Sequence, residues 1–105
     1  MILVITHHFV KPGKVEAATR RLDANGERMA EVPGFLFRYR LVSTDDDHKV
    51  STVTGWESRA GYDEWLRRRR AADAGPAFAG ESPYERVETE VHSVERADTP
   101  AAPAI

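Results

Sequence analysis

The sequence has no cysteine, which excludes disulfide bonds, thiolate metal sites and thiol nucleophiles. It also has no large excess of either charge, since the formal net charge is −2. The charge balance therefore gives no reason to expect nucleic acid as a partner. The apolar stretch from Ile2 to Ile5 is too short to span a membrane, and it lacks the basic lead-in and cleavage site of a secretory signal. These absences predict a cytoplasmic protein with no membrane partner.

Three common catalytic signatures are missing as well: a phosphate-binding loop, a nucleophile elbow and a dinucleotide-binding fingerprint. What is present is the composition of a globular domain, with 105 residues of which 41% are apolar and 30% charged. We predict one domain over residues 1–95. The last residues, 96–105, are predicted to form a disordered tail, since Ala97 to Ile105 holds two prolines and four alanines and has no periodic apolar face.

The hydrophobic periodicity predicts the element order strand, helix, strand, strand, helix, strand. Val15, Ala18, Leu22 and Met29 recur at helical spacing, and Ser58 is placed to cap the second helix. Pro33-Gly34 predicts a turn, and Ala71 to Pro83 a loop. The predicted elements are Ile2 to Val10, Lys14 to Glu31, Phe35 to Ser43, Lys49 to Trp56, Ser58 to about Ala72, and Tyr84 to Val94.

This order is the split unit of a ferredoxin-like α+β fold, in which two helices cover one face of a four-stranded, antiparallel-type sheet. The expected strand order is 4-1-3-2. We expect the first and third strands to lie side by side and parallel, which would bring His8 and Trp56 together at their C-terminal ends.

The other face of the sheet also needs a cover. The first strand is apolar at both parities, as in a strand buried on both sides. The second strand is predicted to place Phe35, Phe37, Tyr39 and Leu41 on one face. A homodimer in which two sheets pack face to face accounts for both patterns.

Trp56 and Tyr62 are the first candidates for a functional site, because a strand end and a helix start bring two rings together. Packing in the core explains such rings equally well. Thr52 and Thr54 share a strand face with Trp56, however, and this face is more polar than core packing needs. A concave apolar pocket with a few hydroxyl groups suits a small aromatic ligand.

The histidines are not predicted to form a metal site. His7 and His8 are adjacent on a strand and point to opposite faces, while His92 is expected near Leu3 and His48 in an exposed turn. Whichever of His7 and His8 faces the pocket is a candidate general base, with a purely structural histidine as the alternative. We therefore predict no metal site, and the resemblance described below implies no other cofactor.

Cations form the third group of candidates. Arg38 and Arg40 share one face of a strand and suit a carboxylate or phenolate, although pairing with acidic residues explains them as well. The run from Arg67 to Arg70 suits a helix C-terminus and a solvated face. Its alternative role is to attract an anionic substrate to the mouth of the pocket.

With the Val-Pro-Gly-Phe-Leu segment, the Trp56-Glu57-Ser58 junction and this element order, the chain resembles the antibiotic biosynthesis monooxygenase family over about residues 2 to 94. The resemblance implies a dimeric α+β barrel. Within the family the chain is similar to actinorhodin-type anthrone oxygenases, which oxidise polycyclic phenols to quinones without metal, flavin or haem.

This resemblance assigns roles to particular residues. Trp56 would stack on the substrate, Tyr62 and Thr52 would form hydrogen bonds, and His8 would remove a proton. Thr52 stands where those oxygenases have an asparagine. The implied partners are a small aromatic, polyketide-like substrate and O2.

The haem-degrading branch of the family is the second comparison. Its helix tryptophan is matched by Trp65, but its haem-ligating histidine falls on Ala74 or Gly75, and its first-strand asparagine falls on Thr6. The remaining alternatives are a redox-neutral cyclase or isomerase that uses the same pocket and a non-catalytic ligand-binding module. The predicted substrate-binding residues are Trp65, Thr54, Thr6, His7, Arg38 and Arg40.

Overall fold

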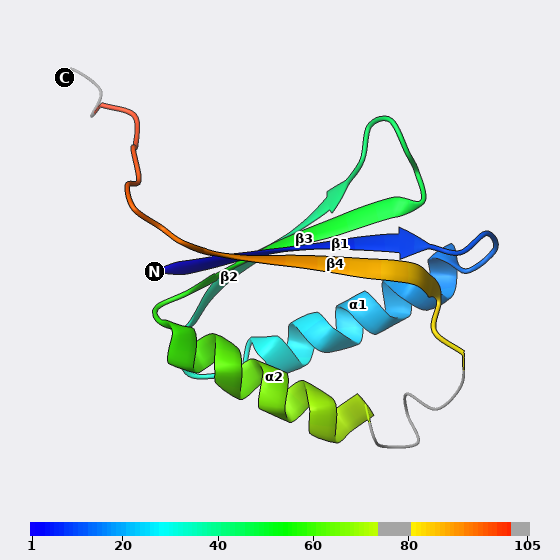
Figure 1. Ribbon diagram of the computed structural model, residues 1–105, viewed down its shortest axis with the longest axis horizontal. Helices are drawn as coiled ribbons and strands as arrows, with labels where there is room; N and C mark the ends of the chain where they lie inside the picture. Colours follow the sequence, from blue (N-terminus) through cyan, green and yellow to red (C-terminus); the bar gives the residue numbers. More distant parts are fainter. Residues whose placement is uncertain (74–80, 102–105) are drawn as a thin grey trace.

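Two helices lie on one face of a four-stranded sheet in the computed structural model, which describes residues 1–73 and 81–101 (Figure 1). The predicted α+β ferredoxin-like fold is confirmed. Residues 74–80 of the predicted loop and residues 102–105 of the predicted tail lie outside the described residues. The elements are β1 (Ile2–Val10), α1 (Val15–Met29), β2 (Phe35–Val42), β3 (Lys49–Trp56), α2 (Arg59–Asp73) and β4 (Tyr84–Ser93).

The strand order is β2-β3-β1-β4, as predicted, but the prediction that β1 and β3 run parallel is wrong. The crossover through α1 makes β2 parallel to β1, and the hairpin between β2 and β3 then reverses the chain. All three neighbouring strand pairs are therefore antiparallel. Within β1 and β3, Ile2 lies opposite Trp56 and His8 lies opposite Val50, so His8 and Trp56 stand near opposite ends of the strand pair.

Apolar side chains at helical spacing fix both helices against the sheet. Ala18, Leu22 and Met29 of α1 are buried. Val15 was predicted on the same face, but it is 44% exposed because it begins the first turn at the edge of the packed layer. In α2 the buried residues include Tyr62 and Trp65, one helical turn apart.

The buried apolar residues form two clusters rather than one. The larger cluster packs around Trp56, which has 0% of its surface exposed. The smaller cluster consists of Val10, Ala18, Leu22 and Val50. Polar side chains from the helix-facing side of the sheet occupy the region between the clusters, and this division positions the candidate site described below. The larger cluster contains Val4, Met29, Val32, Trp56, Tyr62 and Trp65.

An irregularity in β2 changes which face Phe35 occupies. The pairing of β2 with β3 shifts between Phe35 and Phe37, and the Phe35 ring packs edge-on against Trp56 with centroids 5.5 Å apart. The prediction that Phe35 shares a face with Phe37 and Tyr39 is therefore wrong. The Phe37 ring lies over Gly55 on the opposite face, where a Cβ atom at Gly55 would come within 2.1 Å of it.

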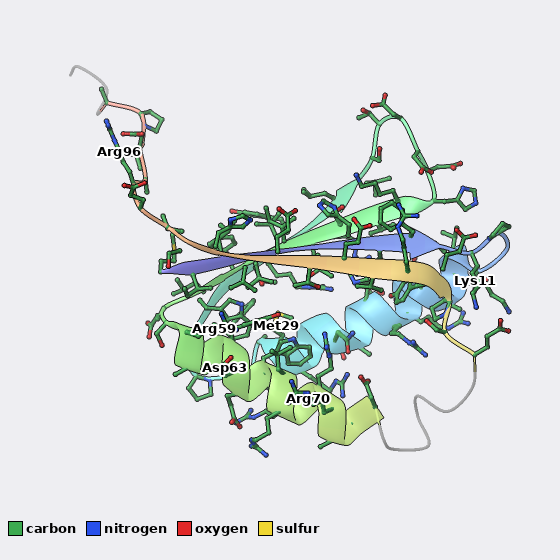
Figure 2. The ribbon with its side chains drawn as sticks, in the orientation of Figure 1. Lys11, Met29, Arg59, Asp63, Arg70 and Arg96 are labelled. Atoms are coloured by element: carbon green, nitrogen blue, oxygen red, sulfur yellow. The ribbon has the colours of Figure 1, made fainter. Side chains whose placement is uncertain are left out.

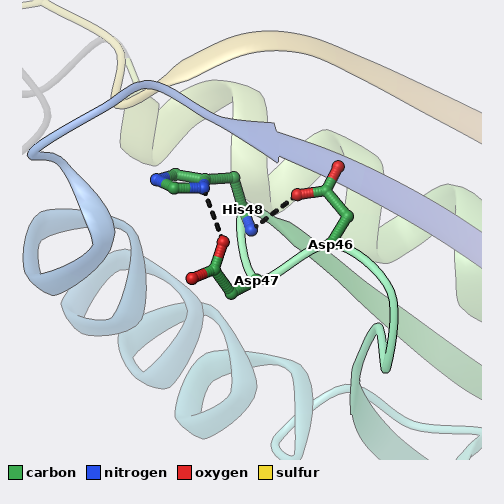
Figure 3. Close-up of side chains that lie close together, drawn as sticks. All are labelled: Asp46, Asp47 and His48. Carbon is green, nitrogen blue, oxygen red and sulfur yellow. Dashed lines mark hydrogen bonds and ion pairs between the residues drawn. The ribbon is translucent and has the colours of Figure 1, made fainter.

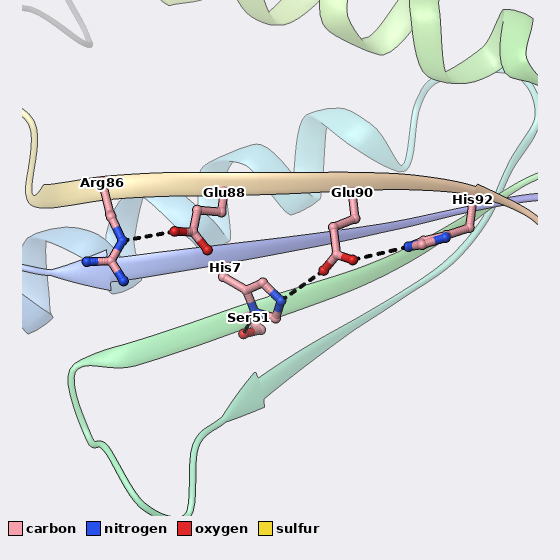
Figure 4. A network of polar contacts seen from close by, with 6 residues as sticks. All are labelled: His7, Ser51, Arg86, Glu88, Glu90 and His92. Atoms are coloured by element: carbon pink, nitrogen blue, oxygen red, sulfur yellow. Dashed lines mark hydrogen bonds and ion pairs between the residues drawn. The ribbon is translucent and has the colours of Figure 1, made fainter.

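The face of the sheet turned away from the helices carries both apolar and charged groups. Tyr39 is 62% exposed and Leu41 is 47% exposed. Figure 4 shows the polar part, in which Glu90 lies 3.4 Å from both His7 and His92. His7 also bonds the Ser51 hydroxyl at 2.7 Å, and His92 pairs with Leu3 across the strands as predicted. We call this surface the open face.

No helix in residues 1–73 and 81–101 is long and apolar enough to cross a membrane.

Candidate functional site

A recess lies between the two helices and the helix-facing side of the sheet, in the gap between the two apolar clusters. Its inner pocket has a volume of about 40 Å³, and an outer hollow of about 270 Å³ shares four of its lining residues, Thr6, His8, Asn25 and Arg69. The inner pocket is lined by Val4, Thr6, His8, Leu22, Asn25, Met29, Arg38, Thr52, Thr54, Tyr62, Trp65 and Arg69.

The alternation of β1 and β3 supplies the hydroxyl groups of the pocket. Thr52 and Thr54 are both buried on the helix-facing side, and Thr6 lies directly across from Thr52. The Trp56 indole donates a hydrogen bond from Nε1 to Thr54 Oγ1 at 3.0 Å. Thr54 is therefore tied to the core, and no hydrogen bond among the described residues uses the Thr52 hydroxyl.

The structure determines which of the paired histidines faces the recess. His8 lines both the inner pocket and the outer hollow. Its Nδ1 lies 3.1 Å from the carbonyl oxygen of Val50, which can only accept a hydrogen bond. Nδ1 must therefore carry the proton. In neutral His8 the lone pair is then on Nε2, and this is the atom that can accept a proton.

The surroundings of His8 also favour its neutral form. Burial lowers the pKa of His8 below 6.5, and the positive charges of Arg38 and Arg69 lower it further. The hydrogen bond to Val50 raises this pKa and is a smaller effect than burial. The neutral form of His8, with its proton on Nδ1, is thus favoured at neutral pH and can accept a second proton.

Arg38 reaches the inner pocket from β2. Its Nε is buried and has no hydrogen-bond partner among the described residues. Burial lowers the pKa of the guanidinium, and the charge of Arg40 adds to this effect. The side chain lies against Gly26 of α1, where a Cβ atom would come within 2.6 Å of Arg38 Nη1.

Tyr62 and Trp65 form the aromatic wall that α2 contributes. The predicted proximity of Tyr62 to Trp56 is seen in the structure, with ring centroids 6.0 Å apart. Burial raises the pKa of Tyr62, so that its hydroxyl keeps its proton and can donate a hydrogen bond. Trp65 is buried and also lines the pocket.

Trp56 lies behind the pocket rather than in its wall. It is fully buried, and its ring packs against those of Phe35 and Tyr62. The expected approach of His8 and Trp56 is wrong, because the antiparallel pairing places them near opposite ends of the strand pair. The geometry gives Trp56 a packing contact with Tyr62 and a hydrogen bond to Thr54, through which it positions two pocket residues.

Two other predicted site residues lie outside the inner pocket. His7 points to the open face, where it contacts Ser51 and Glu90, because neighbouring residues of a strand face opposite sides. Arg40 shares the helix-facing side with Arg38, but it pairs with Asp23 of α1 and does not line the pocket. The predicted residues that do line the pocket are Tyr62, Thr52, His8, Trp65, Thr54, Thr6 and Arg38.

Asn25 and Arg69 line both parts of the recess and were not among the predicted site residues. Each had a signal in the sequence. Asn25 lies one turn from Leu22 and from Met29, so it is a polar residue on an apolar helix face. Arg69 follows Trp65 by four residues and therefore shares its side of α2.

The other cations of the Arg67 to Arg70 run belong to the helix surface. Arg67 and Arg68 both bond Glu64, and the pKa of that carboxyl falls to about 2 because of these hydrogen bonds. Arg70 is exposed, and Figure 2 shows it further along α2 than Arg59 and Asp63, which form an ion pair near the start of the helix. Only Arg69 of the run lines the recess, within the described residues.

One group of potential metal ligands occurs among the described residues, at the tip of the β2–β3 hairpin. Asp46, Asp47 and His48 bring their ligand atoms within 4.8 Å of one another (Figure 3). Their contacts are those of a turn: the His48 amide donates to Asp46 at 2.9 Å, and the His48 ring lies 2.8 Å from Asp47. These contacts account for the cluster as part of the hairpin.

Residues 1–76 match the family model described as antibiotic biosynthesis monooxygenase. This chain belongs to that family. No curated protein matches the sequence. Among solved structures, a mutant of SnoaB, a cofactor-independent oxygenase from Streptomyces nogalater, is 15% identical with a TM-score of 0.71, and the match covers 91% of this chain and 94% of that one.

Two further structures of similar fold extend the comparison. A mutant of MhuD, solved with two manganese protoporphyrin IX molecules per active site, is 20% identical with a TM-score of 0.78; the match covers 94% of this chain and 99% of that one. Rv0793 from Mycobacterium tuberculosis is 17% identical with a TM-score of 0.71, covering 93% and 98% of the two chains. At these identities the likeness establishes the fold alone.

Proposed function

We propose that this family member is a cofactor-independent monooxygenase that oxidises an electron-rich phenol or anthrone to a quinone with O2. The observation that carries the proposal is His8, a neutral histidine whose protonated Nδ1 is held by Val50, in a recess lined by hydroxyl and aromatic groups. Such a group can remove a proton at neutral pH without help from a metal. The family and the fold of the SnoaB oxygenase support the same reaction class.

The reaction begins when His8 Nε2 accepts a proton from the substrate carbon. The resulting carbanion transfers one electron to O2, and the substrate radical and superoxide combine to form a peroxide. Protonated His8 returns its proton to the peroxide. Loss of the second hydrogen from the same carbon then breaks the O–O bond, releases water and leaves the new carbonyl group, so one O2 is consumed for each substrate. The protein contributes orientation, proton transfer and the stabilisation of negative charge.

Arg38, Thr52 and Tyr62 are the groups we assign to the stabilisation of the deprotonated substrate. Arg38 provides a positive charge in a poorly solvated place, where its interaction with an anion is strong. Tyr62 remains protonated and can donate to an oxygen atom of the substrate. Thr52 supplies a buried hydroxyl from the sheet.

This chain lacks the haem ligand of the haem-degrading branch, and haem iron is held in proteins by such a side chain. The sequence has Ala74 or Gly75 where the haem-degrading branch has its ligand, and neither side chain can bind iron. We therefore assign no step of the reaction to haem.

We further propose that the active form is a homodimer in which the open faces of two sheets pack together. Tyr39 and Leu41 leave large apolar side chains exposed on this face, and Phe37 packs against Tyr39 with ring centroids 5.2 Å apart. A second copy of the chain can bury such a surface without any further partner, since each copy offers the same patch to the other.

Oxygen uptake with 1,8-dihydroxyanthrone and related anthrones tests the proposed reaction. The expected result is uptake above the uncatalysed rate, with one O2 consumed per quinone formed. Loss of the substrate without O2 consumption, under air and under nitrogen alike, would support the redox-neutral cyclase or isomerase. Absence of any turnover across the series would favour a ligand-binding module.

A further inference from the structure

The charged side chains that line the inner pocket are all of one sign. Arg38 and Arg69 line it together with His8, and none of the described residues that line it is Asp or Glu. The positive charges of both guanidinium groups lower the pKa of His8. Two carboxylates lie close to these cations but do not line the inner pocket. Asp73 lines only the outer hollow and lies 4.0 Å from Arg69. Asp23, whose charge acts on Arg38, pairs with Arg40. An inner pocket with two permanent cations and no carboxylate is complementary to an anion.

Arg38 has the donor arrangement for a carboxylate. Its buried Nε lacks a hydrogen-bond partner among the described residues, and a buried donor without a partner is costly. A carboxylate can accept from Nε and from one terminal nitrogen at the same time, in a two-point contact that neither a phenolate nor a neutral amide reproduces. Arg40, two residues along the same strand, already has its carboxylate, Asp23.

Gly26 makes room for this arrangement. A glycine inside α1, here in its last turn, weakens the helix, so its presence calls for a reason. A Cβ atom there would come within 2.6 Å of Arg38 Nη1 and 3.4 Å of Cζ. Gly26 thus lets the guanidinium lie against the helix backbone and remain in the pocket wall.

We infer that the substrate is an aromatic acid whose ionised carboxylate is bound by Arg38 in the inner pocket, with Arg69 adding charge where the pocket meets the outer hollow. That the substrate contains an aromatic ring rests on the proposed function. Its carboxylate part concerns binding alone and is tested without turnover. The carboxylate fixes one end of the substrate and thereby directs the ring towards His8 and the outer hollow.

The test compares matched carboxylate and carboxamide ligands by isothermal titration calorimetry. The probes are salicylate, 1-hydroxy-2-naphthoate and anthraquinone-2-carboxylate, each with its carboxamide. In the unmodified protein we expect at least one carboxylate to bind about tenfold or more tightly than its amide, as for a charge-assisted hydrogen bond. Arg38→Gln should remove this preference, and Arg40→Gln should keep it, since Arg40 is paired with Asp23 outside the pocket.

Gly26→Ala provides a second variant in case Arg38→Gln fails to fold. It leaves every polar group in place, but it should push the guanidinium aside and reduce the preference for the carboxylate. Equal affinity for every acid and its amide would overturn the inference, as would a preference that survives both Arg38→Gln and Gly26→Ala. Failure of the oxygen-uptake assay with intact carboxylate binding would overturn the proposed reaction and leave this inference standing.

Discussion

His8 and Val50 lie opposite each other on neighbouring strands, and the His8 ring bonds the Val50 carbonyl oxygen through Nδ1 at 3.1 Å. This contact fixes the proton on Nδ1 and orients the ring on the helix-facing side of the sheet. His7, the preceding residue, has the same chemistry but faces the other side. The proposed base and its matched control are thus adjacent in the sequence.

The pH dependence of the reaction should report the titration of His8. Burial and the nearby arginines lower its pKa, and only the neutral form accepts a proton. We expect kcat/KM to rise with pH along an acidic limb with its midpoint below 6.5, the ordinary value, and then to level off. The rate of O2 uptake between about pH 4.5 and 8 measures this limb, and a midpoint above 6.5 would contradict the assignment.

Replacement of Trp56 should affect folding more than catalysis. Trp56→Ala empties a fully buried site and is expected to lower the free energy of unfolding by about 3–5 kcal/mol. Trp56→Phe keeps most of the volume but leaves Thr54 without its hydrogen bond, so a smaller loss is expected. Urea denaturation measures both losses. If Trp56→Phe were as stable as the unmodified protein but inactive, Trp56 would act on the substrate rather than in the core.

The proposed dimer predicts a specific effect of charge on the open face. Tyr39→Asp changes an exposed side chain, so the isolated chain should keep its fold while the dimer dissociates. Val15→Asp is the matched control, because Val15 is also exposed but belongs to the helix layer. Sedimentation equilibrium at micromolar concentration should give a monomer for Tyr39→Asp and a dimer for Val15→Asp. A monomeric unmodified protein would contradict the proposal itself.

Local sequence patterns were sufficient to predict the elements and much of what lines the recess. The period of two in β3 placed Thr52 and Thr54 on one buried face, and the helical period of α1 placed Leu22 and Met29 in the core. These predictions succeed because each depends on one element and its nearest layer. The positions of His7 and His8 on opposite faces follow from the same alternation.

Predictions that depended on how elements meet were less accurate. The direction of β3 relative to β1 was wrong, and with it the expected approach of His8 to Trp56. Phe35 was placed on the wrong face because no local pattern marks the irregularity after it. Arg69 was hidden in a run of four arginines, and only the packing of α2 on the sheet distinguishes it from Arg67.

The most direct test of the central claim is the rate of O2 uptake with the best anthrone substrate for His8→Gln and His7→Gln, compared at neutral pH and in the same oligomeric state. His8→Gln removes the proton acceptor in the recess, and we expect the rate to fall by roughly 10²- to 10⁴-fold. His7→Gln alters only the open face and should keep a rate close to that of the unmodified protein. A His8→Gln variant with full activity would show that the base lies elsewhere.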